Sequence, residues 1–164
     1  MNAGRNKYRS NCSGTTLVEL LIIVVIIAVL AGTAISILSG SQKQRAAEEA
    51  ATLLAADICY ARAEAIAHHE VRYVLFRTDL ESYGIADQVG LVIHPLSKHN
   101  YQVDLDTRFA GTEIDLLTAD FGGSDSLFFN AKGVPVSEGS VEINAGNSTW
   151  TVYVESTGHV SCGG

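Results

Sequence analysis

A single carboxylate lies within a long apolar segment near the N-terminus. Between Ser10 and Gln42 the only charged residue is Glu19. A carboxylate near the centre of a membrane-spanning helix costs about 2.5–3.5 kcal/mol, so a partner of opposite charge is expected. If the chain is cut after Gly14, Thr15 becomes a new N-terminus, and its ammonium lies about 6 Å along the helix from Glu19. In a staggered bundle, Glu19 of one helix would meet the ammonium of another. The predicted chemistry is charge pairing between subunits.

Two groups of side chains suggest a metal site, and neither has the required pattern. His68, His69 and Glu70 are adjacent, so they point in different directions on a helix, and no second ligand pair has suitable spacing. A solvated helix end is the better interpretation. Calcium takes several loop carboxylates, but no D-x-[DN]-x-[DN]-G loop is present. The acids that we considered for calcium are Asp104, Asp106, Asp115, Asp120 and Asp125. We expect no metal and no cofactor.

The sequence also lacks a motif for catalysis. The glycine-rich stretch FGGSDS at 121–126 has no strand, GK[ST] and helix around it, so it is predicted to be a turn. Ser, His and Asp occur throughout, but no G-x-S-x-G nucleophile motif appears. Trp150 and Tyr153 are expected to pack within the sheets, which is commoner than forming a stacking surface. We therefore predict that the protein is not an enzyme.

The charge balance argues against nucleic acid as a partner. The whole chain carries a formal charge of −7. Residues 41–164 contain eight Lys or Arg and seventeen Asp or Glu, which gives that part a formal charge of −9. Binding to nucleic acid depends on neutralising phosphates with Lys and Arg. We expect no nucleic-acid partner, and this charge also disfavours a DNA-uptake role.

The apolar segment is long enough to cross a membrane. Arg5, Lys7 and Arg9 precede it without any acid. Thr15 to Leu38 comprises 24 residues, and a helix of that length extends about 36 Å, more than the ~30 Å of a bilayer core. Because basic flanks stay in the cytoplasm, we expect one spanning helix with the N-terminus inside.

Two other interpretations of the N-terminus stay open. A secretory signal peptide would be cut near residues 31–34, but the apolar run exceeds the usual ~7–15 residues and no polar region precedes that site. An uncleaved signal anchor would let Glu19 reach toward the headgroups and would give it no specific role. The signal-anchored alternative includes a periplasmic enzyme.

The rest of the chain predicts an α+β fold. An apolar stripe with helical spacing continues the first helix to about His68, and a period-two pattern begins after Glu70. The stripe consists of Ala47, Ala50, Leu54, Ile58, Ala61 and Ala65. The strand candidates are VRYVLFR, SYGIA, GLVIH, YQVDLD, TEIDLL, SLFFN, SVEIN, TWTVYVE and HVSC. We expect a long N-terminal helix, transmembrane and then amphipathic, packed on an antiparallel β-sandwich head.

Of the three cysteines, two lie beyond the expected anchor. Cys12 precedes the apolar run, whereas Cys59 and Cys162 would be in a compartment where disulfides persist. A Cys59–Cys162 disulfide is one option. The sequence does not give the separation of their Cα atoms, so the free and the bridged states both stay open.

The N-terminal residues resemble the processing signal of type IV pilins and type II secretion pseudopilins. The matching features are the basic leader, Gly14, the LVELL stretch that contains Glu19, and the apolar run to Ala31. The resemblance implies that a prepilin peptidase cuts after Gly14 and N-methylates Thr15, a position where the family usually has a bulky apolar residue. It divides the chain into a cleaved leader (1–14), a transmembrane half-helix (15–38), an amphipathic half-helix (39–69) and a periplasmic β-sheet head (70–164).

A second resemblance lies in the last third of the chain. The stretch from LFFNAKG to ESTGHVSC is similar to the C-terminal half of H-type minor pseudopilins, whose heads are β-sandwiches. Residues 78–125 match no pattern that we can name. The two resemblances imply a minor pseudopilin at or near the tip of a type II secretion pseudopilus, with a minor type IV pilin for pilus assembly or DNA uptake as the alternative. The implied partners are the prepilin peptidase, other major and minor pseudopilins and the inner-membrane assembly platform.

Overall fold

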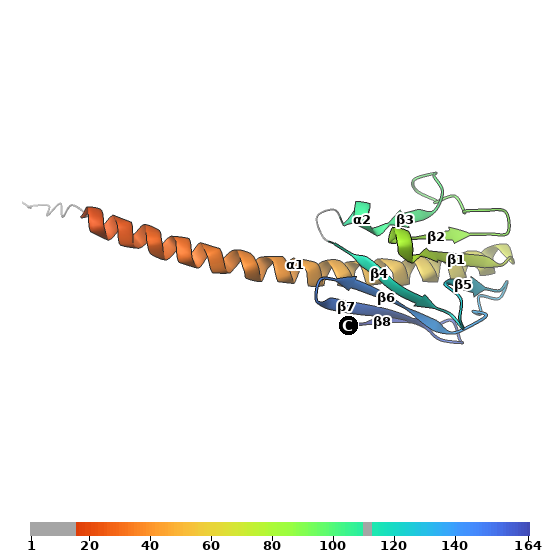
Figure 1. Cartoon of the computed structure of the whole chain (residues 1–164). Helices are drawn as coiled ribbons and strands as arrows, with labels where there is room; N and C mark the ends of the chain where they lie inside the picture. Colours follow the sequence, from red (N-terminus) through yellow and green to blue (C-terminus); the bar gives the residue numbers. More distant parts are fainter. Residues whose placement is uncertain (1–15, 110–112) are drawn as a thin grey trace, which may run out of the picture. The chain divides into compact units, whose positions relative to one another are not determined.

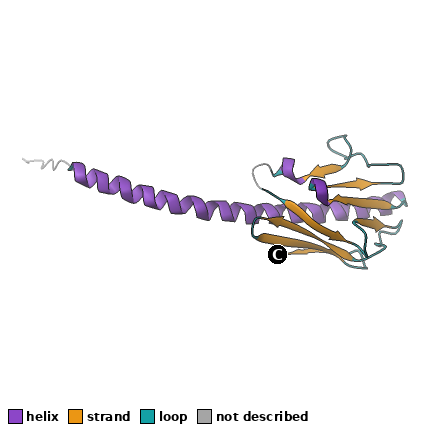
Figure 2. Ribbon diagram, in the orientation of Figure 1, coloured by secondary structure: helices purple, strands orange, loops and turns teal. Residues whose placement is uncertain are grey.

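A long helix, two antiparallel sheets and two short helical turns make up the computed structural model (Figures 1 and 2). The structure describes residues 16–109 and 113–164, without the side chains of 33–39 and 117. The chain divides between Leu38 and Ser39 into two units, which are described separately below. We call Ser39–Gly164 the globular unit.

The long helix α1 (Leu17–His68) contributes to both units. Its bounds agree with the predicted end at His68, and the helix continues through Gly32 and Gly40. Within the globular unit, α1 buries the predicted apolar stripe completely, which confirms the helical spacing read from the sequence. The residues with no exposed surface are Ala47, Ala50, Leu54, Ile58, Ala61 and Ala65.

The first sheet has the strand order β3-β2-β1-β5, and all neighbours are antiparallel. Its strands are β1 (Arg72–Arg77), β2 (Ser82–Ala86), β3 (Gln102–Asp104) and β5 (Ser126–Phe129). The short helical turn η1 (Thr78–Leu80) joins β1 to β2, and α2 (Leu105–Arg108) follows β3.

The second sheet has the order β4-β6-β7-β8, again antiparallel throughout. Its strands are β4 (Asp115–Asp120), β6 (Gly139–Ala145), β7 (Ser148–Val154) and β8 (Val160–Gly163). Side chains that point inward from both sheets form one core with α1, so the predicted sandwich head on a helix is confirmed. Phe76 of β1 and Phe121, just after β4, stack across the two sheets with ring centroids 5.6 Å apart.

Two predicted strands differ in the structure. Instead of a strand at GLVIH, Leu91 and Ile93 form only isolated bridges, because the turn at Asp87 and the turn at His94 leave too few residues between them. The strand predicted at YQVDLD ends at Asp104, whose Oδ1 accepts the Thr107 N–H at 2.8 Å and caps α2. The strand therefore ends at Asp104 because the side chain of this residue caps the first turn of α2.

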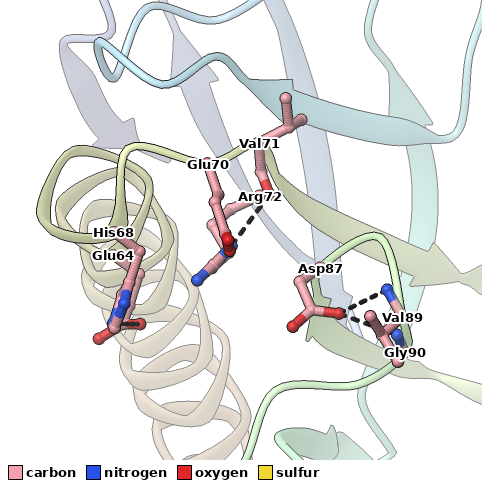
Figure 3. A network of polar contacts seen from close by, with 8 residues as sticks. All are labelled: Glu64, His68, Glu70, Val71, Arg72, Asp87, Val89 and Gly90. Carbon is pink, nitrogen blue, oxygen red and sulfur yellow. Dashed lines mark hydrogen bonds and ion pairs between the residues drawn. The ribbon is translucent and has the colours of Figure 1, made fainter.

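The alternation of β1 places an arginine on the inner face. Arg72 is 4% exposed, beside the buried Val74 and Phe76, whereas Leu75 on the other face is exposed. The Arg72 Nη1 atom donates to Glu70 Oε2 at 3.0 Å (Figure 3). Its Nε atom has no hydrogen-bond partner among the described residues. Arg72 is thus a buried cation at the start of the inner face of β1, and only part of its guanidinium group is hydrogen-bonded.

A buried carboxyl group connects α1 to the first sheet. Asp57 is 8% exposed. The Tyr83 hydroxyl donates to its Oδ2 atom at 2.7 Å, and the Tyr101 hydroxyl donates to its Oδ1 atom at 2.9 Å. Tyr83 belongs to β2 and Tyr101 immediately precedes β3. Because each carboxyl oxygen has a buried donor, these bonds fix where the helix meets the sheet.

A second polar contact attaches α1 to two turns. The Arg62 Nε atom donates to the Gly133 carbonyl at 2.9 Å, Nη1 donates to the Gly158 carbonyl at 2.8 Å, and Nη2 donates to the Thr157 carbonyl at 3.4 Å. Gly133 has a φ of 71°, and a Cβ there would lie 2.6 Å from Ile66 Cδ1 on α1. Only glycine combines that backbone conformation with so close an approach to the helix.

We expect Asp57→Ala to lower the free energy of unfolding by about 2–4 kcal/mol, because two buried tyrosine hydroxyls lose their acceptor. Urea unfolding followed by circular dichroism measures this change. Glu49→Ala, at an exposed position of the same helix, is the matched control and should change stability by less than about 0.5 kcal/mol. An Asp57→Ala protein as stable as the control would show that the two hydrogen bonds contribute nothing.

We also expect stability to fall at alkaline pH. Burial, followed by the nearby Asp57 carboxyl, raises the pKa of Tyr83, and burial with the Asp57 hydrogen bond raises the pKa of Tyr101. Below about pH 10, the ordinary tyrosine pKa, these groups are protonated in both states and their full contribution is present. Above it the unfolded chain loses protons that the folded chain keeps, so the free energy of unfolding decreases as pH rises.

The measurement is urea unfolding at several values between about pH 9 and 11. Tyr83→Phe should make the alkaline decrease shallower, because one of the two raised groups is gone. Tyr153→Phe, at a half-exposed tyrosine, is the control. Equal slopes for wild type and Tyr83→Phe would contradict the assignment.

Candidate functional site

The first part of α1 exposes large apolar side chains on every side. Those between Leu17 and Leu30 are 48% to 82% exposed, with no helical period in their exposure. This contrasts with the stripe in the globular unit, where one side of the helix is buried and the other exposed. A helix that is apolar all round is typical of one that is buried in a membrane or among other helices. We therefore take residues 17–30 as the candidate functional site.

Glu19 lies in the first turn of this helix. Its backbone N–H donates to Thr16 Oγ1 at 3.3 Å, the contact that a T-x-x-E capping box makes at a helix start. A carboxylate there also suits the free N–H groups of the first turn. Thr16 thus caps α1 through its hydroxyl, and the charge of Glu19 favours the same helix start electrostatically, so a test of an intermolecular role for Glu19 has to separate it from this local effect.

The predicted processing residues Gly14 and Thr15 lie outside the described residues. The predicted transmembrane half-helix, 15–38, also includes Thr15 and side chains that are not described. Among the residues that are described, no helix combines the length and the apolar character that crossing a membrane requires.

The metal candidates have local structural roles. His68 is the last residue of α1, and its Nε2 atom lies 3.1 Å from Glu64 Oε2 (Figure 3). His69, which follows, takes a positive φ of 55°. Asp120 Oδ1 accepts the Gly123 N–H at 2.8 Å in the FGGSDS turn between β4 and β5. No group of three or more His, Cys, Asp or Glu residues suited to a metal ion occurs within 16–109 and 113–164.

The disulfide considered for Cys59 and Cys162 is absent, since both are free and exposed thiols. Cys59 lies on α1, and Cys162 lies on β8 at the edge of the second sheet. Cys162 pairs in register with Val152 of β7. The separation of two residues on different elements depends on packing, which the sequence alone does not reveal.

Sequence analysis missed the two polar residues that hold α1 in place. Asp57 carried a usable signal, because an acid directly beside Ile58 of an otherwise apolar stripe requires a buried partner. Arg62 carried none, since its acceptors are backbone carbonyls 71 to 96 residues further along the chain. Both residues belong to the globular unit and position the helix whose first part forms the candidate site.

Two family models match the chain. Residues 50–158, more than half of the chain, match the model described as "Type II transport protein GspH". Residues 9–35 match the prokaryotic N-terminal methylation motif, which includes Gly14, Thr15 and Glu19. None of the curated proteins compared matches the chain.

Solved structures of two kinds of subunit have a similar fold. A structure of the minor pseudopilin EpsH from the type 2 secretion system of Vibrio cholerae aligns at 16% identity and a TM-score of 0.53, covering 71% of this chain and 94% of EpsH. A second EpsH structure gives 15% identity, a TM-score of 0.55 and coverages of 73% and 96%. The type IV minor pilin FimU of Pseudomonas aeruginosa aligns at 20% identity and a TM-score of 0.53, covering 72% of this chain and 88% of the FimU chain. At these identities the likeness establishes the fold.

Proposed function

The chain belongs to the GspH family of type II transport proteins, and from this premise we propose that it enters a pseudopilus as a minor subunit at or near the tip. The family and the fold are those of structural minor pseudopilins of type II secretion, not of enzymes. The observation that carries the proposal is the GspH match over the globular unit together with the methylation motif at the start of α1.

Processing is the first step of the proposed function. A prepilin peptidase cuts after Gly14 and methylates the new N-terminus at Thr15. The match of residues 9–35 to the methylation motif supports this step, as do the basic residues that precede Gly14. The result is a subunit whose first residue carries a positive charge four residues before Glu19.

Assembly is the second step. The half-helix 15–38, which includes the exposed apolar residues 17–30, anchors the subunit in the inner membrane by a single pass, with the N-terminus cytoplasmic and the globular unit periplasmic. The assembly platform then extracts the subunit into the pseudopilus, where the same residues pack against α1 of other pseudopilins. The large exposed apolar area of this segment supports a place both in the membrane and among the helices of the pseudopilus, because each environment removes that area from water.

Glu19 sets the register in this proposal. In an apolar bundle, its carboxylate pairs with the terminal ammonium of a neighbouring subunit, so that neither charge is buried alone. A helix shifted by one turn would separate the charges by about 5 Å and leave both without a partner. The pairing therefore selects one stagger between adjacent helices.

A minor type IV pilin is the nearest alternative. Its fold is equally close, since FimU aligns as well as EpsH does. The GspH match favours secretion. The formal charge of −9 on residues 41–164 also disfavours DNA uptake, because phosphate binding needs local positive charge.

Cleavage after Gly14 is directly testable. N-terminal sequencing and mass spectrometry of protein extracted from membranes should show a chain that begins at Thr15 and carries one methyl group on its amine. A chain that begins at Met1, or between residues 32 and 35, would contradict the proposed processing. Gly14→Ala should block cleavage and leave the full-length precursor in the membrane fraction.

The role of Glu19 is tested with two substitutions. Glu19→Ala removes both the charge and the fourth residue of the T-x-x-E sequence, whereas Glu19→Gln keeps a residue that suits that position. If Glu19 pairs with an ammonium, both variants leave a buried charge without a partner, at a cost of about 3–5 kcal/mol, and lower incorporation by about two to four orders of magnitude.

The readout is crosslinking to other pilin-like subunits from a photoreactive residue at Ile26, an exposed position of α1. Membrane level and cleavage after Gly14 are measured in parallel and should remain normal, since neither requires a partner helix. Wild-type crosslinking by Glu19→Gln, with loss only in Glu19→Ala, would assign the residue to helix capping. Wild-type crosslinking by both would show that Glu19 has no role in assembly.

A further inference from the structure

The outer faces of the two sheets differ in chemistry. The outer face of β6 and β7 is polar apart from Tyr153, as expected for an antiparallel sheet that faces water. Its residues are Ser140, Glu142, Asn144, Thr149, Thr151 and Tyr153. The outer face of the first sheet instead carries Tyr73, Leu75 and Phe128, and the Tyr73 and Phe128 rings meet edge to face at 5.1 Å. Beside these apolar groups the same face carries the exposed Arg77 of β1, so the first sheet is the better candidate for contact with a partner.

A pocket of about 320 Å³ lies on that apolar face. Its floor includes Gly84 and Ala86 of β2, Leu75 of β1 lies beside them, and the loop 87–91 forms one wall. Ala86 is 4% exposed, so β2 is covered on its outer side as well as its inner side. A pocket of this size accommodates side chains of a peptide segment.

The loop that forms the wall is fixed in position. Asp87 Oδ1 accepts the backbone N–H of Val89 at 2.7 Å and of Gly90 at 2.9 Å (Figure 3). Leu91 forms an isolated bridge with Ala86. The Leu91 side chain lies over Gly84, where a Cβ would come within 2.8 Å of Leu91 Cδ2. Because these bonds hold the loop, the pocket exists before any partner arrives, which lowers the entropic cost of binding.

The two charged groups of the pocket differ in whether they already have hydrogen-bond partners. The Asp87 carboxylate already accepts two N–H groups, which lower its pKa and keep it ionised. No described residue forms a hydrogen bond or an ion pair with the Arg77 guanidinium, which lines the opposite end of the pocket. Ser82 pairs in register with Arg77, is 2% exposed and has a hydroxyl without a partner among the described residues. The Ser82 hydroxyl is buried beneath this surface, so the pocket offers the Arg77 cation beside an apolar floor.

We propose that this pocket docks a segment of a different protein, which places an apolar side chain against Leu75 and Leu91 and a carboxylate against Arg77. Charge complementarity selects an acidic segment, because a carboxylate accepts from the Arg77 guanidinium in a fork geometry. A second copy of this chain is disfavoured, since residues 41–164 of each copy carry a formal charge of −9 and repel one another, whereas a different protein can present a locally acidic segment without so large a net negative charge. The inference rests on the proposed function in that the partner is met in the assembled pseudopilus.

The test uses the full chain in secreting cells, with a photoreactive amino acid placed at Val89 on the rim of the pocket. Val89 is 96% exposed and lies in the wall loop. The matched control is the same amino acid at Tyr153, which is 52% exposed on the outer face of the second sheet. We expect a discrete crosslink from Val89 and none from Tyr153. Mass spectrometry should place it on another protein, within about three residues of an apolar side chain and of an Asp or Glu.

Substitutions at Arg77 then test the charge. Arg77→Glu should lower the Val89 crosslink by about tenfold or more, whereas Arg77→Lys should retain most of it. Crosslinking from Ile26 on α1 is measured in the same cells. If the Ile26 crosslinks persist, a missing Val89 crosslink, a crosslink to a second copy, or an unchanged yield in Arg77→Glu overturns the docking pocket alone. If the chain that is otherwise wild type gives no crosslinks from Ile26, the proposed function is overturned as well.

Discussion

The globular unit depends on one side of one helix that must serve two sheets at once. The stripe on α1 is composed mainly of alanines, with Leu54 and Ile58 as its only large members. Alanine lets the core residues of both sheets approach the helix closely, and the two larger side chains are fully buried in the same core. An apolar stripe of this kind specifies which side of the helix packs on the sheets, but it does not fix the position of the sheets along the helix axis. The polar contacts of Asp57 and Arg62 supply that position, because hydrogen bonds tolerate little displacement.

These two residues act in different directions. Asp57 faces the first sheet through two tyrosine hydroxyls, and Arg62 faces the turns that follow β5 and β7 through carbonyl oxygens. Because they are five positions apart in the sequence, they are separated by more than one helical turn. The helix is thus held at two points by partners from opposite parts of the fold. Sliding of α1 would break both sets of bonds together, so these contacts fix the position of the packed half of the helix within the globular unit.

Local pattern explains what could be predicted and what could not. The bounds of α1, its stripe and most strands follow from periodicity, which depends only on neighbours in the sequence. The predicted strand at Leu91 and Ile93 was wrong because turn-forming contacts of Asp87 and His94 interrupt it. The partners of Asp57 lie 26 and 44 residues away, and those of Arg62 lie further still. The exposed apolar segment and Glu19 were predictable, since their significance lies in spacing along the chain. The pocket at Arg77 was not, because strand register brings its residues together.

The central claim is that α1 has two separable parts, one that belongs to the globular unit and one that serves assembly. Equilibrium unfolding of a fragment that contains residues 41–164 tests it most directly, since the fragment keeps the stripe, Asp57 and Arg62 and lacks the exposed segment. The account predicts a soluble monomer with helical circular dichroism and a single cooperative transition in urea. An aggregated fragment, or one without a cooperative transition, would show that the globular unit requires the first half of α1 and would contradict the account.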